Sequence, residues 1–311
     1  MVKKVDVIIP TYKPTEKLNK LLKMLKVQTY PVNRVILINT EEKYFTAFAY
    51  GNKNFSFDSN VLVKHISRME FDHGATRNYG ISLSDAEYFI CMTDDAVPMD
   101  EFLVENLLEP LLAGNAVVSY ARQCVGKRGA LIEGFTRKFN YPEESRLKTK
   151  EDIATMGIKA FFCSNVCAAY KRSVFEQLGR FDTPMIFNED MIFASKVLNA
   201  GYAIAYQANA RVRHAHRYTN LQQLKRNFDL GVSQAKYPEI FSVVSSTSEG
   251  KALVKQTIAY LKEKGKADKI PGYIITSGYK YIGYQLGKHY RMLPRKWIMK
   301  LTMNPCYWYK E

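Results

Sequence analysis

The segment VDVIIPTY, residues 5–12, begins with a β-branched apolar run, Val5–Ile9, that ends at Pro10. Such a run is typical of a buried strand. Residues 16–27 follow with leucines at helical spacing, and Arg34–Ile38 is a second short apolar run. Strand, helix and strand at this spacing predict a βαβ unit, which requires parallel pairing and a sheet covered on both faces.

The same alternation continues through the first half of the chain. We expect strands at Val61–Ile66, Tyr88–Met92 and Ala116–Tyr120, and helices at Ala75–Ser84 and Glu101–Leu112. From residue 123 glycines and basic residues suggest a loop-rich connection. Order is expected to return in three later segments: a mixed apolar segment at Lys159–Tyr170, a helix at Asp190–Asn199 and a strand at Tyr202–Tyr206. The fold class is therefore α/β.

The composition is that of a globular protein. The 311 residues are 47% hydrophobic and 24% charged, which excludes disordered, collagen-like and disulfide-scaffold proteins. The five cysteines are odd in number and mostly lie in apolar runs, so free thiols in a reducing compartment are expected. Cys163 and Cys167 are four residues apart, but no second pair at zinc-like spacing accompanies them.

The net charge of +15 indicates an anionic partner: nucleic acid, a membrane surface or a phosphorylated substrate. Most of the excess is local, because residues 251–311 hold 13 basic and 3 acidic residues. A Ser-rich stretch, SVVSSTSEG at 242–250, precedes this region and is interpreted as a linker. The charge therefore belongs to the C-terminal part of the chain.

The C-terminal region combines a helical pattern at Lys251–Lys264 with cations and aromatic residues in PGYIITSGYKYIGYQLGKHYRMLPRKWIMK, residues 271–300. This mixture is typical of a membrane interface. A helical appendage packed on the rest of the chain, or a dimer contact, would explain it equally. The sequence has no run of 18 uncharged apolar residues and no signal-peptide core, so the protein is expected to be cytoplasmic and at most peripheral.

Polar residues follow the predicted strands at the sheet edge where α/β proteins bind ligands. Pro10, Thr11 and Tyr12 follow the first strand, and Asn39 and Thr40 follow the second. Asp94 and Asp95 follow the strand at 88–92. Adjacent carboxylates suit Mg²⁺ or Mn²⁺ bridging a diphosphate, although a solvated turn would look the same.

Three other groups of residues carry chemistry. Glu189 and Asp190 stand at the start of a predicted helix. They would supply either a general base or charges that complement the helix dipole. Gly74 and Arg77 stand at a predicted helix start, where an anion would bind. His214 and His216 point to the same side of an extended segment, as metal or phosphate contacts or as exposed loop histidines.

In order, the segments VIIPTY (7–12), HGATRNYG (73–80), FICMTDDAVP (89–98) and FNEDMIFASKVLNAGY (187–202) resemble the family 2 glycosyltransferases, inverting enzymes with a GT-A fold. The resemblance covers about residues 3–220. HGATRN, TDDA, SNVCAAYKR (164–172) and HAHRYT look like the rhamnosyltransferase branch, similar to the enzymes that build rhamnan or rhamnose-glucose cell-wall polysaccharide in Gram-positive bacteria.

This resemblance implies a mixed, mainly parallel sheet flanked by helices and a helical C-terminal extension. It divides the chain into a catalytic domain at 1–245 and a basic aromatic region at 246–311. Within the domain, residues 1–122 would bind the nucleotide sugar and residues 123–245 the acceptor. The reaction would transfer L-rhamnose from dTDP-β-L-rhamnose, with inversion, to a hydroxyl of a lipid-linked rhamnose-containing glycan at the inner face of the cell membrane.

The resemblance also implies roles for individual residues. Asp190 would be the catalytic base, and Mn²⁺ or Mg²⁺ would be held by Asp95 with His214 or His216; Thr93 replaces the first Asp of the usual metal motif. The expected donor contacts are Pro10, Thr11, Tyr12, Asn39, Thr40, Arg77 and Asp94. The expected acceptor contacts are Ser164, Asn165, Asn188 and Glu189.

Several alternatives stay open. The same scaffold handles glucose, galactose and N-acetylhexosamine donors. A nucleotidyltransferase would need a Gly-rich basic phosphate loop after the first strand, which PTYKP lacks. A nucleic-acid-binding module would show an RRM, KH or helix-turn-helix signature, so no nucleic acid partner is expected. A catalytically inactive sugar-binding relative is disfavoured because Asp95, Glu189 and Asp190 are intact.

Overall fold

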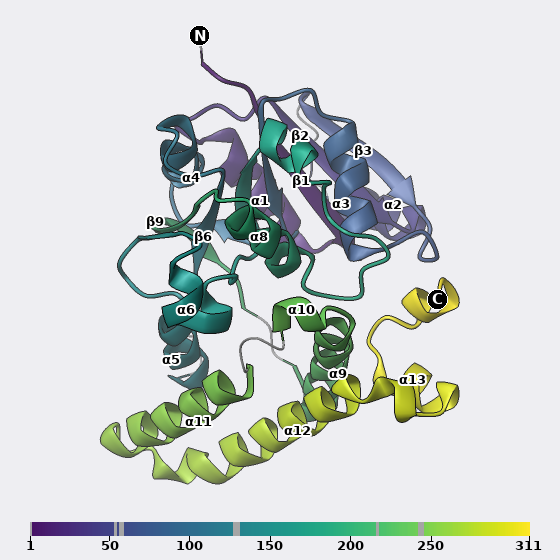
Figure 1. Ribbon diagram of the computed structural model, residues 1–311. Helices are drawn as coiled ribbons and strands as arrows, with labels where there is room; N and C mark the ends of the chain where they lie inside the picture. Colours follow the sequence, from purple (N-terminus) through teal and green to yellow (C-terminus); the bar gives the residue numbers. More distant parts are fainter. Residues whose placement is uncertain (1, 53–54, 56–58, 127–130, 216–217, 242–245) are drawn as a thin grey trace.

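The computed structural model describes residues 2–52, 55, 59–126, 131–215, 218–241 and 246–311. One nine-stranded sheet crosses the upper half of the molecule and carries helices on both faces (Figure 1). Its strands are β1 (Val5–Tyr12), β2 (Arg34–Thr40), β3 (Val61–Ile66), β4 (Tyr88–Met92), β5 (Val97–Pro98), β6 (Val118–Cys124), β7 (Arg146–Lys148), β8 (Cys167–Lys171) and β9 (Ile204–Arg213).

The sheet has the order β3-β2-β1-β4-β8-β6-β9-β5, with β7 beside β9. Strands β1 to β4 pair in parallel, as the βαβ pattern predicts, and β8 lies antiparallel between β4 and β6. The α/β class and the mixed, mainly parallel sheet are therefore confirmed. In the β1–β2 register Thr11 lies opposite Asn39 and Tyr12 opposite Thr40, so the expected donor contacts share one edge.

The helices surround this sheet and extend below it. They are α1 (Glu16–Lys26), α2 (Glu42–Gly51), α3 (His73–Ser82), α4 (Leu103–Leu112), α5 (Leu131–Asn140), α6 (Asp152–Met156), α7 (Arg172–Gln177), α8 (Glu189–Asn199), α9 (Asn220–Lys236), α10 (Pro238–Phe241), α11 (Ser246–Glu263), α12 (Ile270–Lys288) and α13 (Arg295–Leu301). The periodic segments of the sequence thus form helices where expected, within a few residues.

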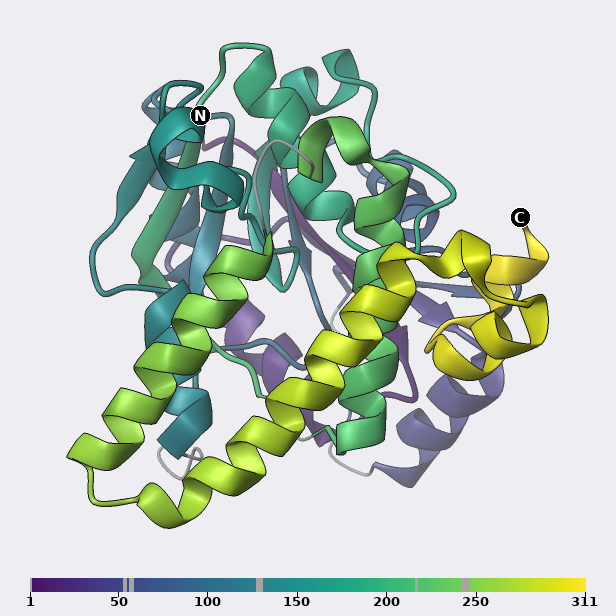
Figure 2. The ribbon, with the colours of Figure 1, turned by 60° about the horizontal axis from the view of Figure 1, so that its bottom comes forward.

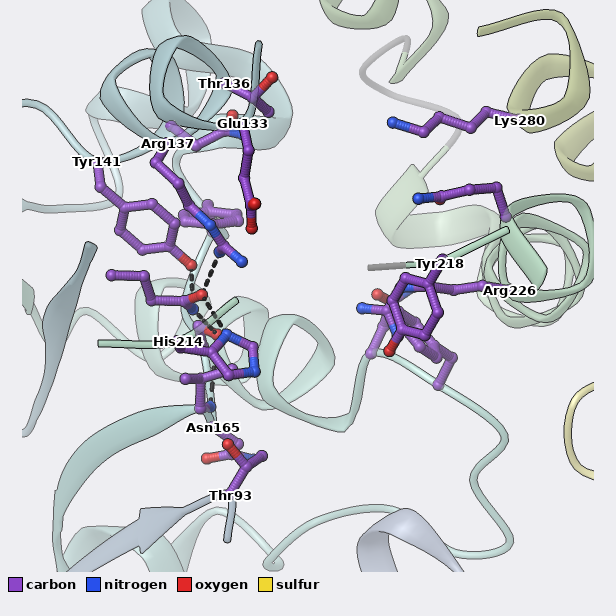
Figure 3. A pocket seen from close by; sticks show the side chains of 18 of the residues that line it. Thr93, Glu133, Thr136, Arg137, Tyr141, Asn165, His214, Tyr218, Arg226 and Lys280 are labelled. Atoms are coloured by element: carbon purple, nitrogen blue, oxygen red, sulfur yellow. Dashed lines mark hydrogen bonds between the residues drawn. The ribbon is translucent and has the colours of Figure 1, made fainter. Parts of the chain in front are cut away.

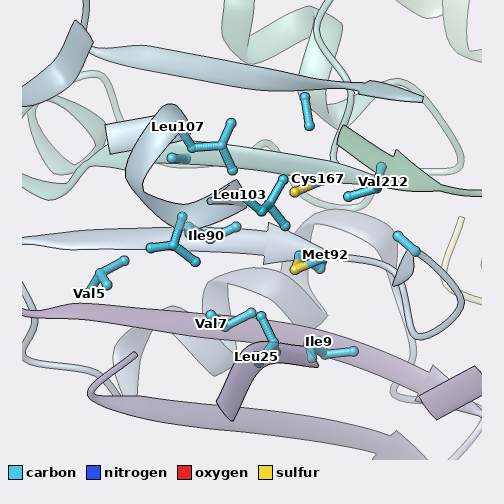
Figure 4. Close-up of a cluster of buried hydrophobic side chains, with 14 of the residues drawn as sticks. Val5, Val7, Ile9, Leu25, Ile90, Met92, Leu103, Leu107, Cys167 and Val212 are labelled. Carbon is cyan, nitrogen blue, oxygen red and sulfur yellow. The ribbon is translucent and has the colours of Figure 1, made fainter. Parts of the chain in front are cut away.

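Each face of the sheet has its own core. Alternate residues of β1 point to one face, where Val7 and Ile9 pack with leucines of α1 and α4 (Figure 4). Ile8 points to the other face and joins residues of α3, α7 and α8, including Phe193. Full burial of one such side chain contributes roughly 1.5–3 kcal/mol, so both helix layers are held firmly against the strands.

Two expectations about irregular segments are wrong. The connection expected after residue 123 contains helix α5, in which Gly134 occupies a helical position, followed by β7 and α6. Of the linker expected at 242–250, residues 246–250 begin α11, and residues 242–245 lie outside the described residues. The Glu249 carboxylate near the start of α11 pairs with Lys159 at 2.7 Å and anchors the helix to the domain.

The C-terminal helices pack on the rest of the chain, as the appendage alternative expected. A β-carbon added to Gly283 of α12 would lie 2.1 Å from the Leu224 carbonyl oxygen of α9, and one added to Gly287 would lie 2.1 Å from that of Phe228. The two backbones are therefore in direct contact (Figure 2). Among the described residues, every helix is too short or too polar to cross a bilayer.

Candidate active site

A cavity of about 1150 Å³ lies between the carboxyl side of the sheet and the helices below it (Figure 3). One wall carries Thr93, Asn165, His214 and residues of α5, and the opposite wall carries Tyr218, Arg226 of α9 and Lys280 of α12 (Figure 3). The expected site residues that line it are Arg77, Ser164, Asn165, Asn188, Glu189, Asp190 and His214. The C-terminal helices thus complete the cavity.

Asp190 is the ionisable group best suited to accept a proton in this cavity. Its Oδ2 accepts a hydrogen bond from the Asn165 backbone N–H at 2.9 Å, and its Oδ1 accepts one from the Met191 N–H at 2.8 Å. Burial, and next the charge of Glu189, raise the pKa of Asp190 to about 7. A carboxylate with a pKa near neutrality is a stronger base than an exposed aspartate.

Glu189 has a different environment from its neighbour. Its carboxylate lies 3.1 Å from Arg77 Nη1 and accepts a hydrogen bond from Asn165 Nδ2 at 3.0 Å. Burial alone would raise the pKa of Glu189, but the charge of Arg77, with His73 and Asn165, lowers it. The Glu189 side chain is buried, with 5% of the residue exposed. Glu189 therefore stays ionised and keeps the proton affinity of Asp190 high.

Arg77 lies in a buried network with Glu189 and Asn165. Other hydrogen bonds position the expected acceptor contacts Asn165 and Asn188. Tyr170 Oη donates to Asn165 Oδ1 at 2.7 Å, so the Asn165 side chain is fixed from both ends. Asn188, in a left-handed conformation with φ 65°, turns the chain into α8, and its Nδ2 donates to Ser233 of α9 at 3.4 Å. The expected contact of Arg77 with a donor phosphate stays a prediction.

The expected metal ligands Asp95 and His214 meet at the same edge of the sheet. His214 Nε2 lies 3.3 Å from Asp95 Oδ1, and Lys17 Nζ lies 3.3 Å from Asp95 Oδ2. His214 Nδ1 is 3.0 Å from Gln123 Oε1, an acceptor that also receives a hydrogen bond from Arg137, so Nδ1 donates to Gln123 and Nε2 is the ring nitrogen that faces the carboxylate. His216 lies outside the described residues.

This donor set fits a divalent cation that a diphosphate also coordinates. One carboxylate oxygen and one imidazole nitrogen converge, and Mn²⁺ accepts both ligand types. No group of three or more His, Cys, Asp or Glu side chains is assembled in the described part of the chain, so water and phosphate would complete the coordination. The hydroxyl of Thr93, at the first position of the motif, is buried with no hydrogen-bond partner among the described residues.

The expected nucleotide contacts gather beside this pair. Thr11 Oγ1 donates to Asp94 Oδ2 at 2.7 Å, and burial raises the pKa of Asp94 to about 6. Tyr12 and Thr40 line a second cavity of about 260 Å³, together with Met303 and other residues. Pro10 lies within β1 and Asn39 is fully buried; neither lines the two cavities.

Asn39 is nevertheless close to this edge. Its Nδ2 lies 3.0 Å from His65 Nδ1, and its buried Oδ1 has no hydrogen-bond partner among the described residues. An unsatisfied buried acceptor costs free energy until a donor reaches it.

Sequence reasoning missed several residues of the site. The sequence places Gln123 only at the start of a loop-rich connection, yet its amide holds His214 and donates to Ser164 Oγ at 2.9 Å. Arg226 and Lys280 come from helices that carry no catalytic motif. Only the cation excess of the C-terminal region hinted at Lys280.

Residues 6–179 match Glycosyl transferase family 2. The chain is 36% identical to the O-antigen chain rhamnosyltransferase RfbN of Salmonella typhimurium over 98% of its length and 96% of the relative's. It is also 36% identical to the O-antigen chain rhamnosyltransferase WbaN of Salmonella anatum, over 97% of this chain and 94% of that one.

Solved structures share the fold. The mannosyltransferase PcManGT from Pyrobaculum calidifontis, in complex with GDP-Man and Mn²⁺, superposes with a TM-score of 0.54 at 14% identity, over 100% of this chain and 87% of that one. Residues 1–349 of S. aureus TarS, in complex with UDP-GlcNAc, superpose with a TM-score of 0.50 at 14% identity, over 93% of this chain and 91% of that one. With its sheet, its cavity and its matching sequence, the chain belongs to glycosyltransferase family 2.

Proposed function

We propose that this glycosyltransferase moves L-rhamnose from dTDP-β-L-rhamnose to a hydroxyl of a lipid-linked glycan, with inversion at the anomeric carbon. The observation that carries the proposal is Asp190, a carboxylate with a raised pKa that faces a cavity large enough for two sugars. The two rhamnosyltransferase relatives, which align over nearly the whole chain, support rhamnose as the donor sugar.

In the proposed mechanism Asp190 takes the proton from the acceptor hydroxyl. The hydroxyl oxygen then forms a bond to the anomeric carbon, and the bond from that carbon to the diphosphate oxygen breaks with its electron pair. Asn165 and Met191 orient the base through their backbone N–H groups. Asp95 and His214 would hold Mn²⁺ or Mg²⁺, which offsets charge on the departing diphosphate. Thr11, Tyr12, Thr40 and Asp94 would bind the nucleoside.

The acceptor would be presented at a membrane. The names of the relatives favour an O-antigen chain over the Gram-positive cell-wall polysaccharide expected from the motifs alone. Helix α12 supports a position at the inner face of the cell membrane. Its outer side exposes Ile274, Ile275, Tyr281 and Ile282, each by more than half, and cations follow at Lys288 and beyond. Rings and aliphatic groups beside cations suit an anionic lipid surface.

The experiment that tests the proposal is incubation with a panel of dTDP-, UDP- and GDP-sugars and a short rhamnosyl-lipid acceptor, with Mn²⁺, Mg²⁺ or EDTA. We expect a gain of one deoxyhexosyl residue in product mass with dTDP-β-L-rhamnose alone. Asp190→Asn should lose activity by about 10²–10⁴-fold while dTDP binding is kept. Transfer of glucose, galactose or an N-acetylhexosamine in place of rhamnose would contradict the proposed donor. Full activity of Asp190→Asn would contradict the proposed base.

A further inference from the structure

Two cations on the wall formed by α9 and α12 have no carboxylate partner among the residues that the structure describes. Arg226 and Lys280 both line the large cavity, and neither forms an ion pair or hydrogen bond with another described side chain. Figure 3 places both on the wall opposite Thr93, Asn165 and His214. They therefore stand apart from the expected metal ligands, although Arg226 also lines the second cavity together with Tyr12 and Thr40.

Their surroundings keep the two charges in place without neutralising them. The Arg226 guanidinium lies 4.6 Å from the Phe187 ring centre and 5.7 Å from that of Tyr218, so aromatic faces hold it on two sides. Burial, and next the positive charge of Arg226, lower the pKa of Lys280. Two like charges that are partly removed from water destabilise each other until an anion binds between them.

Two other cations that line the cavity have polar partners. Arg77 pairs with Glu189, and Arg137 donates to Gln123. Glu133 lies on the opposite wall and forms no ion pair with a described residue (Figure 3). Among the described residues, the cavity cations without a carboxylate or amide partner, Arg226, Lys280 and Lys269 at the start of α12, thus lie on the α9–α12 side, and an anion with two linked charged groups matches them.

We infer that Arg226 and Lys280 form a diphosphate-binding site for the carrier lipid of the acceptor. This inference rests on the proposed function. The donor diphosphate is expected on the other wall, beside Asp95 and His214. Helix α12 joins the two surfaces that such an acceptor needs, because Tyr273, Thr276 and Lys280 line the cavity while its outer side exposes apolar residues. The carrier chain would lie in the membrane and its diphosphate would enter the cavity.

The test compares Lys280→Ala with Lys23→Ala, a control lysine at an exposed position of α1, away from the cavity and from α12. With a polyprenyl-diphosphate-linked acceptor, we expect Lys280→Ala to raise the acceptor KM about tenfold or more, with kcat and the donor KM unchanged. With a phosphate-free alkyl rhamnoside, both variants should match the wild type. An increase in the donor KM would assign the cations to the donor diphosphate, and equal losses with both acceptors would indicate a structural role; either result overturns the inference.

A binding measurement separates this inference from the proposed function. Farnesyl diphosphate should bind the full chain in titration calorimetry, farnesol should bind at least tenfold more weakly, and Lys280→Ala should remove the difference. If farnesyl diphosphate binds in this way but no rhamnose is transferred, the site stands and the proposed function fails. If rhamnose is transferred but Lys280→Ala binds farnesyl diphosphate like the wild type, the function stands and the inference fails.

Discussion

The ionisation of Asp190 should control the rate near neutral pH. Burial and the charge of Glu189 raise its pKa to about 7, and only the ionised form accepts a proton. The ionised fraction is then about 0.09 at pH 6 and about 0.91 at pH 8, so kcat/KM should rise about tenfold between these values. The rise should stop once the group is fully ionised.

Substitution of the neighbouring carboxylate separates this cause from other titrations. Glu189→Gln removes the negative charge that raises the pKa of Asp190 and leaves the positive charge of Arg77 in the network. The midpoint of the pH profile should therefore move to lower pH, by about one unit. Glu176→Gln, on α7 and paired with Arg180, is the control and should leave the midpoint unchanged.

The assay is release of dTDP from dTDP-β-L-rhamnose in the presence of acceptor, at pH values from 5.5 to 9. Circular dichroism at each pH checks that the fold is kept. A flat profile between pH 6 and 8 would refute the assignment of Asp190 as the base. A midpoint that stays in place or rises in Glu189→Gln would refute the electrostatic explanation of its raised pKa.

Three other predictions concern the C-terminal helices. In chemical denaturation, Gly283→Ala should lower the free energy of unfolding by about 2 kcal/mol because its β-carbon meets a backbone oxygen at 2.1 Å, whereas Gly278→Ala, with open space around it, should not. Burial raises the pKa of Asp229 to about 7. Between about pH 4 and 7 the folded state therefore keeps a proton that the unfolded state has lost, so the free energy of unfolding falls as the pH rises through this range. Asp229→Asn should make that slope shallower by about 1 kcal/mol per pH unit in urea titrations. Ile282→Glu should weaken sedimentation with anionic liposomes, and Tyr50→Glu, 87% exposed on α2, should not; equal binding of both would argue against α12 as the membrane face.

The strands of the sheet and many of the helices beside it could be predicted because their signals are local. The strands Val61–Ile66 and Tyr88–Met92 have the predicted bounds, and α8 begins at Glu189, one residue before the predicted start. Apolar periodicity and β-branching act within a few residues, so they can be seen along the chain. The position of Asp190 at the start of α8 follows from the same local pattern.

The partners of the site residues could not be predicted because they come from distant segments. His214 is held by Gln123, 91 positions away, and Arg77 is neutralised by Glu189. Gly283 lies within α12, where the absence of a side chain allows α9 and α12 to touch. That contact creates the wall with Lys280, and nothing in either helix alone indicates it.

The anomeric configuration of the product tests the central claim most directly. In the proposed mechanism Asp190 activates an acceptor that attacks from the side opposite the diphosphate, so a β-configured donor would yield an α-linked product. The measurement is the one-bond carbon–hydrogen coupling at the new anomeric centre, by NMR, after reaction with dTDP-β-L-rhamnose. We predict an α-L-rhamnosyl linkage; a β-L-rhamnosyl linkage would contradict the mechanism.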